Sequence, residues 1–182
     1  LIPCWWGLAL ASNGWPDWGF VALFFVGAFV MRAAGCTVND LADRNFDRVV
    51  ARTANRPIAS GELTVFHAAV FLVTLLIIGF AILLQFNIIT IFLGLASLVL
   101  LAIYPFMKRF TYWPQLFLGI TFNYGLILGW TSIENEISLI PIILYIGAIF
   151  WTLGYDTIYG YQDINDDEII GVKSTSIKFK DN

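Results

Sequence analysis

The stretch GFVALFFVGAFVMRAAGCTVNDLADRNFD, residues 19–47, joins an apolar run to a polar segment that is rich in carboxylates. A helix needs about 20 apolar residues to cross a hydrocarbon core of about 30 Å, and residues 19–38 meet this requirement. Residues 39–47 then bring four acidic or amide side chains: Asn39, Asp40, Asp43 and Asp47. Acidic groups at membrane depth cost about 2.5–3.5 kcal/mol each on insertion scales, so cations must offset their charge.

The composition of the whole chain is that of a membrane protein. Of its 182 residues, 59% are hydrophobic and 13% are charged, and the mean hydropathy is +0.78. A soluble domain carries about 25% charged residues. Apolar windows long enough for membrane-spanning helices recur at residues 19–38, 63–84, 88–107, 114–131 and 138–155. We therefore predict an all-α, polytopic transmembrane helix bundle with five full spans.

The two ends of the chain both suggest a part of a longer protein. Residues 1–11 form an apolar run that is too short to cross a membrane, and we expect them to be the end of a first helix. At the other end, the chain stops inside the polar stretch GVKSTSIKFKDN. We expect residues 1–182 to be a single domain that is truncated at both ends.

Basic residues gather on one side of the predicted bundle. If the chain crosses the membrane at every window, loops 39–62, 107–113 and 156–182 share one side and hold nine of the ten Lys and Arg residues. The tenth, Arg32, lies inside a span. The charged residues of the opposite loops are all acidic: Asp17, Glu134 and Glu136. Because basic loops stay on the cytoplasmic side, we predict that the basic loops face the cytoplasm of a bacterium or the mitochondrial matrix.

Two acidic clusters lie on this same predicted side. On a helix, Asn39, Asp43 and Asp47 fall on one face because four residues separate each from the next. The segment DINDD repeats this spacing with Asp163 and Asp167. Oxygen ligands favour Mg²⁺, which usually takes one or two carboxylates together with substrate phosphates, whereas zinc prefers Cys and His. The two clusters therefore predict Mg²⁺ as the cofactor.

Basic side chains on the same side complete the pattern: Arg44, Arg48, Arg52, Arg56, Lys108, Arg109 and Lys173. Arg is well suited to bidentate contacts with phosphate. Acidic groups for the metal and basic groups for phosphate predict a diphosphate site at the mouth of an apolar bundle. Such a site suits a polyprenyl diphosphate, which has a charged head and a long apolar tail.

Two other interpretations of the charged clusters stay open. Ordinary interfacial loops also contain Asp–Arg pairs, each of which contributes about 0–1 kcal/mol. A membrane transporter with a one-sided ion site also places ionisable residues in a bundle, although transport pathways usually spread them toward the membrane midplane. Neither interpretation accounts for two clusters of matching spacing with basic residues between them.

These motifs resemble those of a known family. NDLADRNFD fits the NDxxDxxxD motif, and DINDD the DxxxD motif, of the UbiA superfamily of intramembrane prenyltransferases. Three longer strings resemble its 4-hydroxybenzoate polyprenyltransferase branch, which serves ubiquinone synthesis: MRAAGCTVNDLADRNFDRVVARTANRPIASG, YPFMKRFTYWPQLFLG and GYDTIYGYQDINDDEIIGVKSTSI. Branches with haem, naphthoate, homogentisate or chlorophyllide acceptors share parts of these strings and remain alternatives.

The resemblance implies a fold, a reaction and roles for individual residues. The family fold is a nine-helix bundle around a cavity, of which this chain would supply the end of the first helix through the sixth. The implied reaction transfers a polyprenyl group from polyprenyl diphosphate to the ring carbon ortho to the hydroxyl of 4-hydroxybenzoate. Nucleic acid is not an expected partner, and the oligomeric state is left open.

The implied site has two metal ions and a set of substrate contacts. Asp43 and Asp47 would bind one Mg²⁺, and Asp163 and Asp167 the second; these four aspartates are also the predicted catalytic residues. Substrate-binding residues beside them would be Asn39, Asp40, Arg52, Lys108, Arg109 and Lys173. The pattern leaves open which of the basic residues contact the diphosphate and which contact the benzoate carboxylate.

Overall fold

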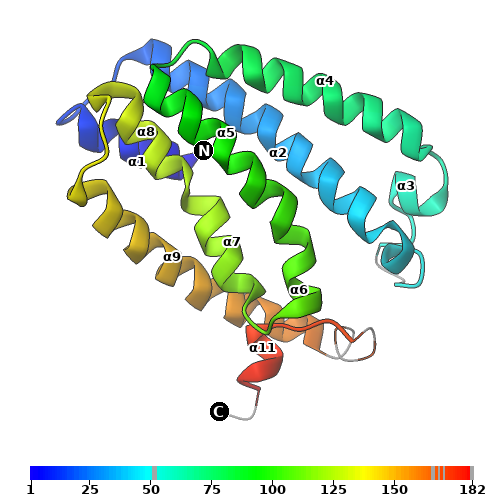
Figure 1. The fold of residues 1–182 in the computed structure, drawn as a ribbon. Coiled ribbons are helices and arrows are strands. Elements are labelled where there is room, and N and C mark those ends of the chain that lie inside the picture. Colours follow the sequence, from blue (N-terminus) through cyan, green and yellow to red (C-terminus); the bar gives the residue numbers. More distant parts are fainter. Residues whose placement is uncertain (51–52, 165–166, 168, 170, 181–182) are drawn as a thin grey trace.

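Every regular element in the part of the chain that the structure describes is a helix, which confirms the predicted all-α class (Figure 1). The computed structural model describes residues 1–50, 53–164, 167, 169 and 171–180. The longer helices are α1 (Ile2–Ala11), α2 (Trp18–Asp47), α4 (Val65–Leu83), α5 (Ile88–Ile103), α7 (Pro114–Asn123), α8 (Gly125–Glu134) and α9 (Leu139–Tyr159). The short ones are α3 (Pro57–Ser60), η1 (Tyr104–Phe106), α6 (Met107–Phe110), η2 (Gly160–Asp163) and α11 (Thr175–Lys178).

Five helical stretches within the described ranges are long and apolar enough to cross a membrane, as the hydropathy windows predicted. They are Trp18–Asp47, Val65–Leu83, Ile88–Phe110, Pro114–Glu134 and Leu139–Asp163. In the second of these, only 11% of the most apolar window is buried inside the protein. The large apolar side chains that remain on the outside are suited to lipid, so the protein is an integral membrane protein.

The end of α2 differs from the prediction. The hydropathy windows predict a loop from Asn39, whereas α2 continues to Asp47 and is 30 residues long. Hydropathy reports which residues prefer lipid, but it does not report where a helix ends; Leu41, Ala42 and Arg44 are good helix formers and carry the helix beyond its apolar part. The first acidic motif therefore lies on the last turns of a membrane-spanning helix.

Close contacts between glycine-bearing faces hold α1 against α8. A Cβ atom added to Gly7 would lie 2.1 Å from the carbonyl oxygen of Leu126, and one added to Gly129 would lie 2.2 Å from that of Cys4. The backbones can approach this closely only because these positions have no side chain, an arrangement that is common between membrane helices. A hydrogen bond of 3.0 Å between the hydroxyls of Thr90 and Thr131 links α8 in turn to α5.

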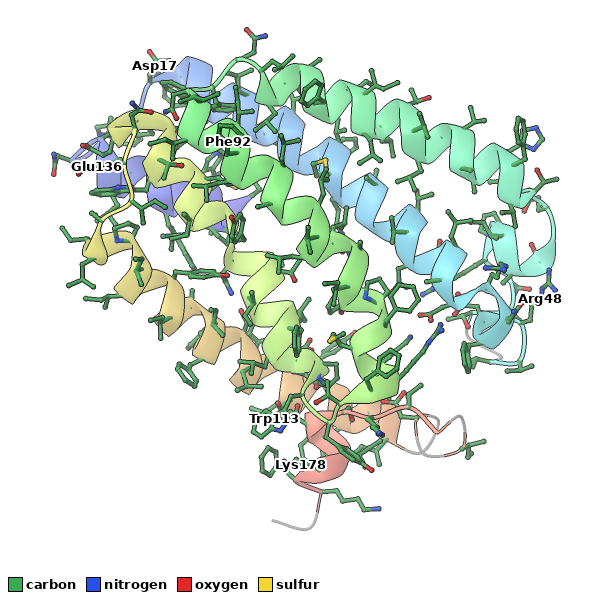
Figure 2. All side chains as sticks on the ribbon, in the orientation of Figure 1. Asp17, Arg48, Phe92, Trp113, Glu136 and Lys178 are labelled. Carbon is green, nitrogen blue, oxygen red and sulfur yellow. The ribbon has the colours of Figure 1, made fainter. Side chains whose placement is uncertain are left out.

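The polar segments gather at one end of the bundle. Figure 2 shows Asp17 and Glu136 at one end, and Arg48, Trp113 and Lys178 at the opposite end. The second end holds the last turns of α2, the α6–α7 turn and the segment after α9 (Figure 1). The three basic loops thus share one end of the molecule, and the compartment that this end faces stays a prediction.

Candidate functional site

Six of the ten predicted site residues line one small polar cavity of ≈140 Å³ at the polar end of the bundle. Asn39, Asp43 and Asp47 reach it from the last turns of α2, and Lys108 reaches it from α6. Asp163, at the end of η2, and Asp167 reach it from the segment after α9. The two acidic motifs are 116 residues apart at their nearest positions, as Asp47 and Asp163 show, yet they face the same space.

Asp43 is the most buried of these carboxylates, with 2% of its surface exposed. Lys108 donates to its Oδ2 through Nζ, and Arg109 donates to its Oδ1 through Nη2 at 3.0 Å. The same Arg109 nitrogen donates to the carbonyl oxygen of Ala42 at 2.9 Å. A buried carboxylate without such partners would be costly, and α6 supplies two cationic partners that hold the Asp43 carboxylate in place.

Aromatic rings hold the guanidinium of Arg109. Its central carbon lies 4.9 Å from the ring centre of Phe46 on α2 and 5.3 Å from that of Phe106 in η1. Cation–π contacts of this kind contribute about 0.5–1 kcal/mol each at partly exposed sites. Arg109 is not among the residues that line the polar cavity. Its contacts with Asp43 and Phe46 join α6 to α2.

Arg56, one of the basic residues on the predicted polar side but not one of the predicted substrate contacts, also lines the polar cavity. Its Nη1 donates to Oδ1 of Asp40 at 2.9 Å and to Oδ2 of Asp47 at 3.1 Å, so one cation bridges two carboxylates of the first motif. The loop that carries Arg56 is fixed by Thr53, whose hydroxyl donates to the carbonyl oxygen of Asp47 at 3.1 Å. The one-sided distribution of basic residues was the available signal, but it did not distinguish Arg56 from its neighbours.

A second, larger cavity of ≈580 Å³ adjoins the polar one, and its lining is mainly apolar. Asn39 and Arg56 line both cavities, so the two spaces meet at these residues. Along α2 the lining residues follow helical spacing and form one stripe: Leu23, Phe24, Gly27, Ala28, Met31, Arg32, Gly35, Cys36, Asn39 and Asp40. Asp40 therefore belongs to the larger cavity, at its polar end.

Of the two remaining predicted residues, the structure describes only Lys173, and it places this residue away from both cavities. The side chain of Lys173 is directed to the α6–α7 turn, where Nζ donates to the carbonyl oxygen of Phe110 at 3.4 Å and lies 5.4 Å from the ring centre of Tyr112. Lys173 does not line either cavity. Arg52 lies outside the described residues.

Comparison with known proteins identifies the family. Residues 1–182 match the UbiA prenyltransferase family over their whole length. The chain belongs to this family. The resemblance that the two acidic motifs indicated is thus confirmed.

Relatives of known name and structure agree with this assignment to the UbiA family. The mitochondrial 4-hydroxybenzoate polyprenyltransferase of Rattus norvegicus is 48% identical over 184 residues, which cover 100% of this chain and 49% of the relative. That of Arabidopsis thaliana is 50% identical over 183 residues, covering 99% of this chain and 45% of the relative. The chain thus spans about half the length of the curated relatives it matches.

A solved structure of a UbiA homolog from Aeropyrum pernix K1 has the same fold. The two superpose with a TM-score of 0.79 at 29% sequence identity, over 94% of this chain and 66% of that chain. This match confirms that the helices form a UbiA-type transmembrane bundle.

The donor atoms of the polar cavity fit Mg²⁺ as the UbiA family would use it. The four aspartates and Asn39 offer oxygen ligands. Among the described residues, no three His, Cys, Asp or Glu side chains are grouped closely enough to hold a metal ion by themselves. Mg²⁺ commonly completes its six ligands with substrate phosphates and water. The arrangement therefore suits a metal ion that is shared between carboxylates and a diphosphate, and it does not suit an all-protein cage.

Proposed function

We propose that the protein transfers a polyprenyl group from polyprenyl diphosphate to the ring carbon ortho to the hydroxyl of 4-hydroxybenzoate, in a Mg²⁺-dependent step of ubiquinone synthesis. Support for the acceptor comes from the names of the relatives, which match nearly the whole chain at 48–50% identity. The same relatives are mitochondrial, which supports the mitochondrial inner membrane as the location, with the acidic motifs facing the matrix.

The observation that carries the proposal is the contact between the two cavities. A polar space lined by four aspartates and Lys108 meets a larger apolar space at Asn39 and Arg56. A prenyl diphosphate has the same two parts, because its charged head adjoins a long hydrocarbon tail. Bound in this way, its scissile C–O bond would lie near the shared residues, between the polar and the apolar space.

The proposed roles follow from charge and polarity. Asp43, Asp47, Asp163 and Asp167 would hold Mg²⁺, which when bound neutralises the charge that grows on the departing diphosphate. Lys108 and Arg56, which line the polar cavity, would contact the diphosphate oxygens. The apolar walls of the larger cavity would exclude water from the allylic cation. The ring carbon ortho to the hydroxyl would then attack the cation and lose its proton, which restores the aromatic ring.

One assay on the full-length protein in detergent tests this function. Labelled polyprenyl diphosphate, 4-hydroxybenzoate and Mg²⁺ should give prenylated 4-hydroxybenzoate, and EDTA should abolish the product. Asp43→Ala and Asp163→Ala should each reduce product formation by about 10- to 100-fold or more, as loss of metal-site side chains does. Unchanged product in both variants would contradict the site. Transfer only to another aromatic acceptor would contradict the branch and leave the family assignment intact.

A further inference from the structure

The segment that follows the second acidic motif, residues 171–179, is anchored by polar residues that the proposed chemistry does not use. We call this segment the strap. Its centre is buried: Thr175 and Ser176 are 0% exposed, and Ser174 is 5% exposed. Figure 1 shows α11, which contains the end of the strap, against the lower ends of α7 and α9. Buried polar groups need hydrogen-bond partners, so the partners of the strap determine its position.

Gln115, at the start of α7, provides one of these partners. Its Oε1 accepts from the backbone N–H of Thr175 at 3.0 Å, and Gln115 itself is 8% exposed. Thr157 on α9 provides two more. Its hydroxyl lies 2.7 Å from that of Thr175, and its carbonyl oxygen accepts from the hydroxyl of Ser176 at 2.6 Å. Gln115 and Thr157 thus hold the strap between α7 and α9.

The strap leads directly back to the polar cavity. The carbonyl oxygen of Asp167 accepts from the backbone N–H groups of Gly171 at 2.9 Å and Val172 at 3.1 Å. Val172 lines the polar cavity, and the next residue, Lys173, donates its backbone N–H to the carbonyl oxygen of Lys108 at 2.7 Å. A short chain of contacts therefore connects Thr175 to Asp167 of the second motif and to Lys108, the partner of Asp43.

We propose that Gln115 is a positioning residue for the two-motif site: through the strap it sets where Asp167 lies relative to Lys108 and Asp43. Gln115 does not line the polar cavity, so it acts through Thr175 and Lys173. Without its oxygen, the buried N–H of Thr175 would lack its partner, and the strap would shift toward water to find one. This inference rests on the proposed function, because it assumes that the cavity binds a metal–diphosphate complex.

The same helix offers a matched control. Asn123, at the other end of α7, is also a buried amide, 2% exposed, and it also ties α7 to α9. Its Nδ2 donates to the carbonyl oxygen of Ala148 at 3.0 Å and to the hydroxyl of Thr152 at 2.8 Å. Within the described part of the chain, none of the side-chain hydrogen bonds of Asn123 involves the strap. Gln115→Met and Asn123→Leu each replace a buried amide by an apolar side chain of similar size, so both should lower stability.

The experiment measures binding rather than turnover. Full-length protein in detergent is titrated with Mn²⁺ in the presence of inorganic diphosphate, and the bound metal is followed by electron paramagnetic resonance. Gln115→Met should raise the Mn²⁺ concentration for half-saturation by about 10-fold, whereas Asn123→Leu should change it by less than about 2-fold. Thr157→Val removes one hydroxyl and keeps the shape of the side chain, and it should also weaken Mn²⁺ binding. If the Gln115→Met protein does not fold, Thr157→Val decides the test.

The outcomes separate this inference from the proposed function. Wild-type protein should bind Mn²⁺ with diphosphate, and Asp43→Asn should not; failure of the wild type overturns the function and the inference with it. Binding by the wild type together with unchanged affinity in Gln115→Met and Thr157→Val overturns the positioning role alone. Equal weakening by Gln115→Met and Asn123→Leu also overturns it, because general loss of α7–α9 packing would then explain the effect.

Discussion

At the scale of single residues, Asp43 combines burial with two cationic partners. Replacement by Asn keeps its volume but removes the carboxylate charge that Lys108 and Arg109 contact, so both the proposed metal ligand and the order of α6 are affected. We expect Asp43→Asn to lower prenyl transfer by about 10- to 100-fold or more. Asp17→Asn is the control, since Asp17 is an exposed cap of α2 that accepts from Gly19 N–H at the opposite end. Similar losses of prenyl transfer in both variants would contradict the prediction, because removal of any carboxylate charge would then explain them.

Arg109 allows a second prediction, because its contacts depend on the planar guanidinium. Arg109→Lys keeps the charge but cannot contact Asp43, the Ala42 carbonyl and two aromatic rings together. We expect the free energy of unfolding to fall by about 1.5–3.5 kcal/mol, the sum of the two cation–π contacts and one hydrogen bond. Thermal unfolding in detergent measures this change. Lys178→Arg, an exposed cation over Trp113, should leave the unfolding temperature unchanged.

At the scale of elements, the α1–α8 contact has a sharp steric test. Gly129→Ala places a methyl group 2.2 Å from the Cys4 carbonyl oxygen and 2.9 Å from the Leu8 nitrogen, so the two backbones must separate. Overpacking of this kind costs about 1–3 kcal/mol, and the unfolding temperature should fall. Gly147→Ala on α9 meets nothing within 4 Å and should leave it equal or higher, because Ala favours helix over Gly. Equal effects of the two changes would contradict the close approach.

The same scale shows what the sequence could predict. The five spans follow from length and hydropathy, and the two aspartate pairs follow from the four-residue spacing within each of two segments, because all of these are local properties. Arg56 and Gln115 were not selected because their partners lie on other elements: Gln115 meets Thr175, 60 residues away. No local sequence pattern predicts the tertiary partner of a Gln, a Thr or a Ser beside a membrane span. The strap therefore becomes visible only when α7 and α9 are placed side by side.

At the scale of the whole molecule, the two adjoining cavities match the charged head and the apolar tail of the proposed polyprenyl diphosphate. Counted from Asn39, where the cavities meet, the stripe of lining residues on α2 runs back through Ala28. At 1.5 Å per residue, Ala28 lies about 16 Å along the helix from Asn39. A short prenyl tail would end before this position, whereas a long one would pass it. We therefore expect the length of the apolar cavity to limit the length of the prenyl tail that it accepts.

Ala28→Phe tests this limit by placing a ring across the apolar cavity. We expect transfer from long polyprenyl diphosphates to fall by about 10-fold or more relative to transfer from geranyl diphosphate, because an overpacked cavity cannot relax without cost. Val26→Phe is the matched control: Val26 also lies on α2 but is 48% exposed and does not line the cavity. Product yields from a series of donors of increasing length measure the ratio. If both variants keep the wild-type ratio, the tail does not run along α2, and the larger cavity has another occupant.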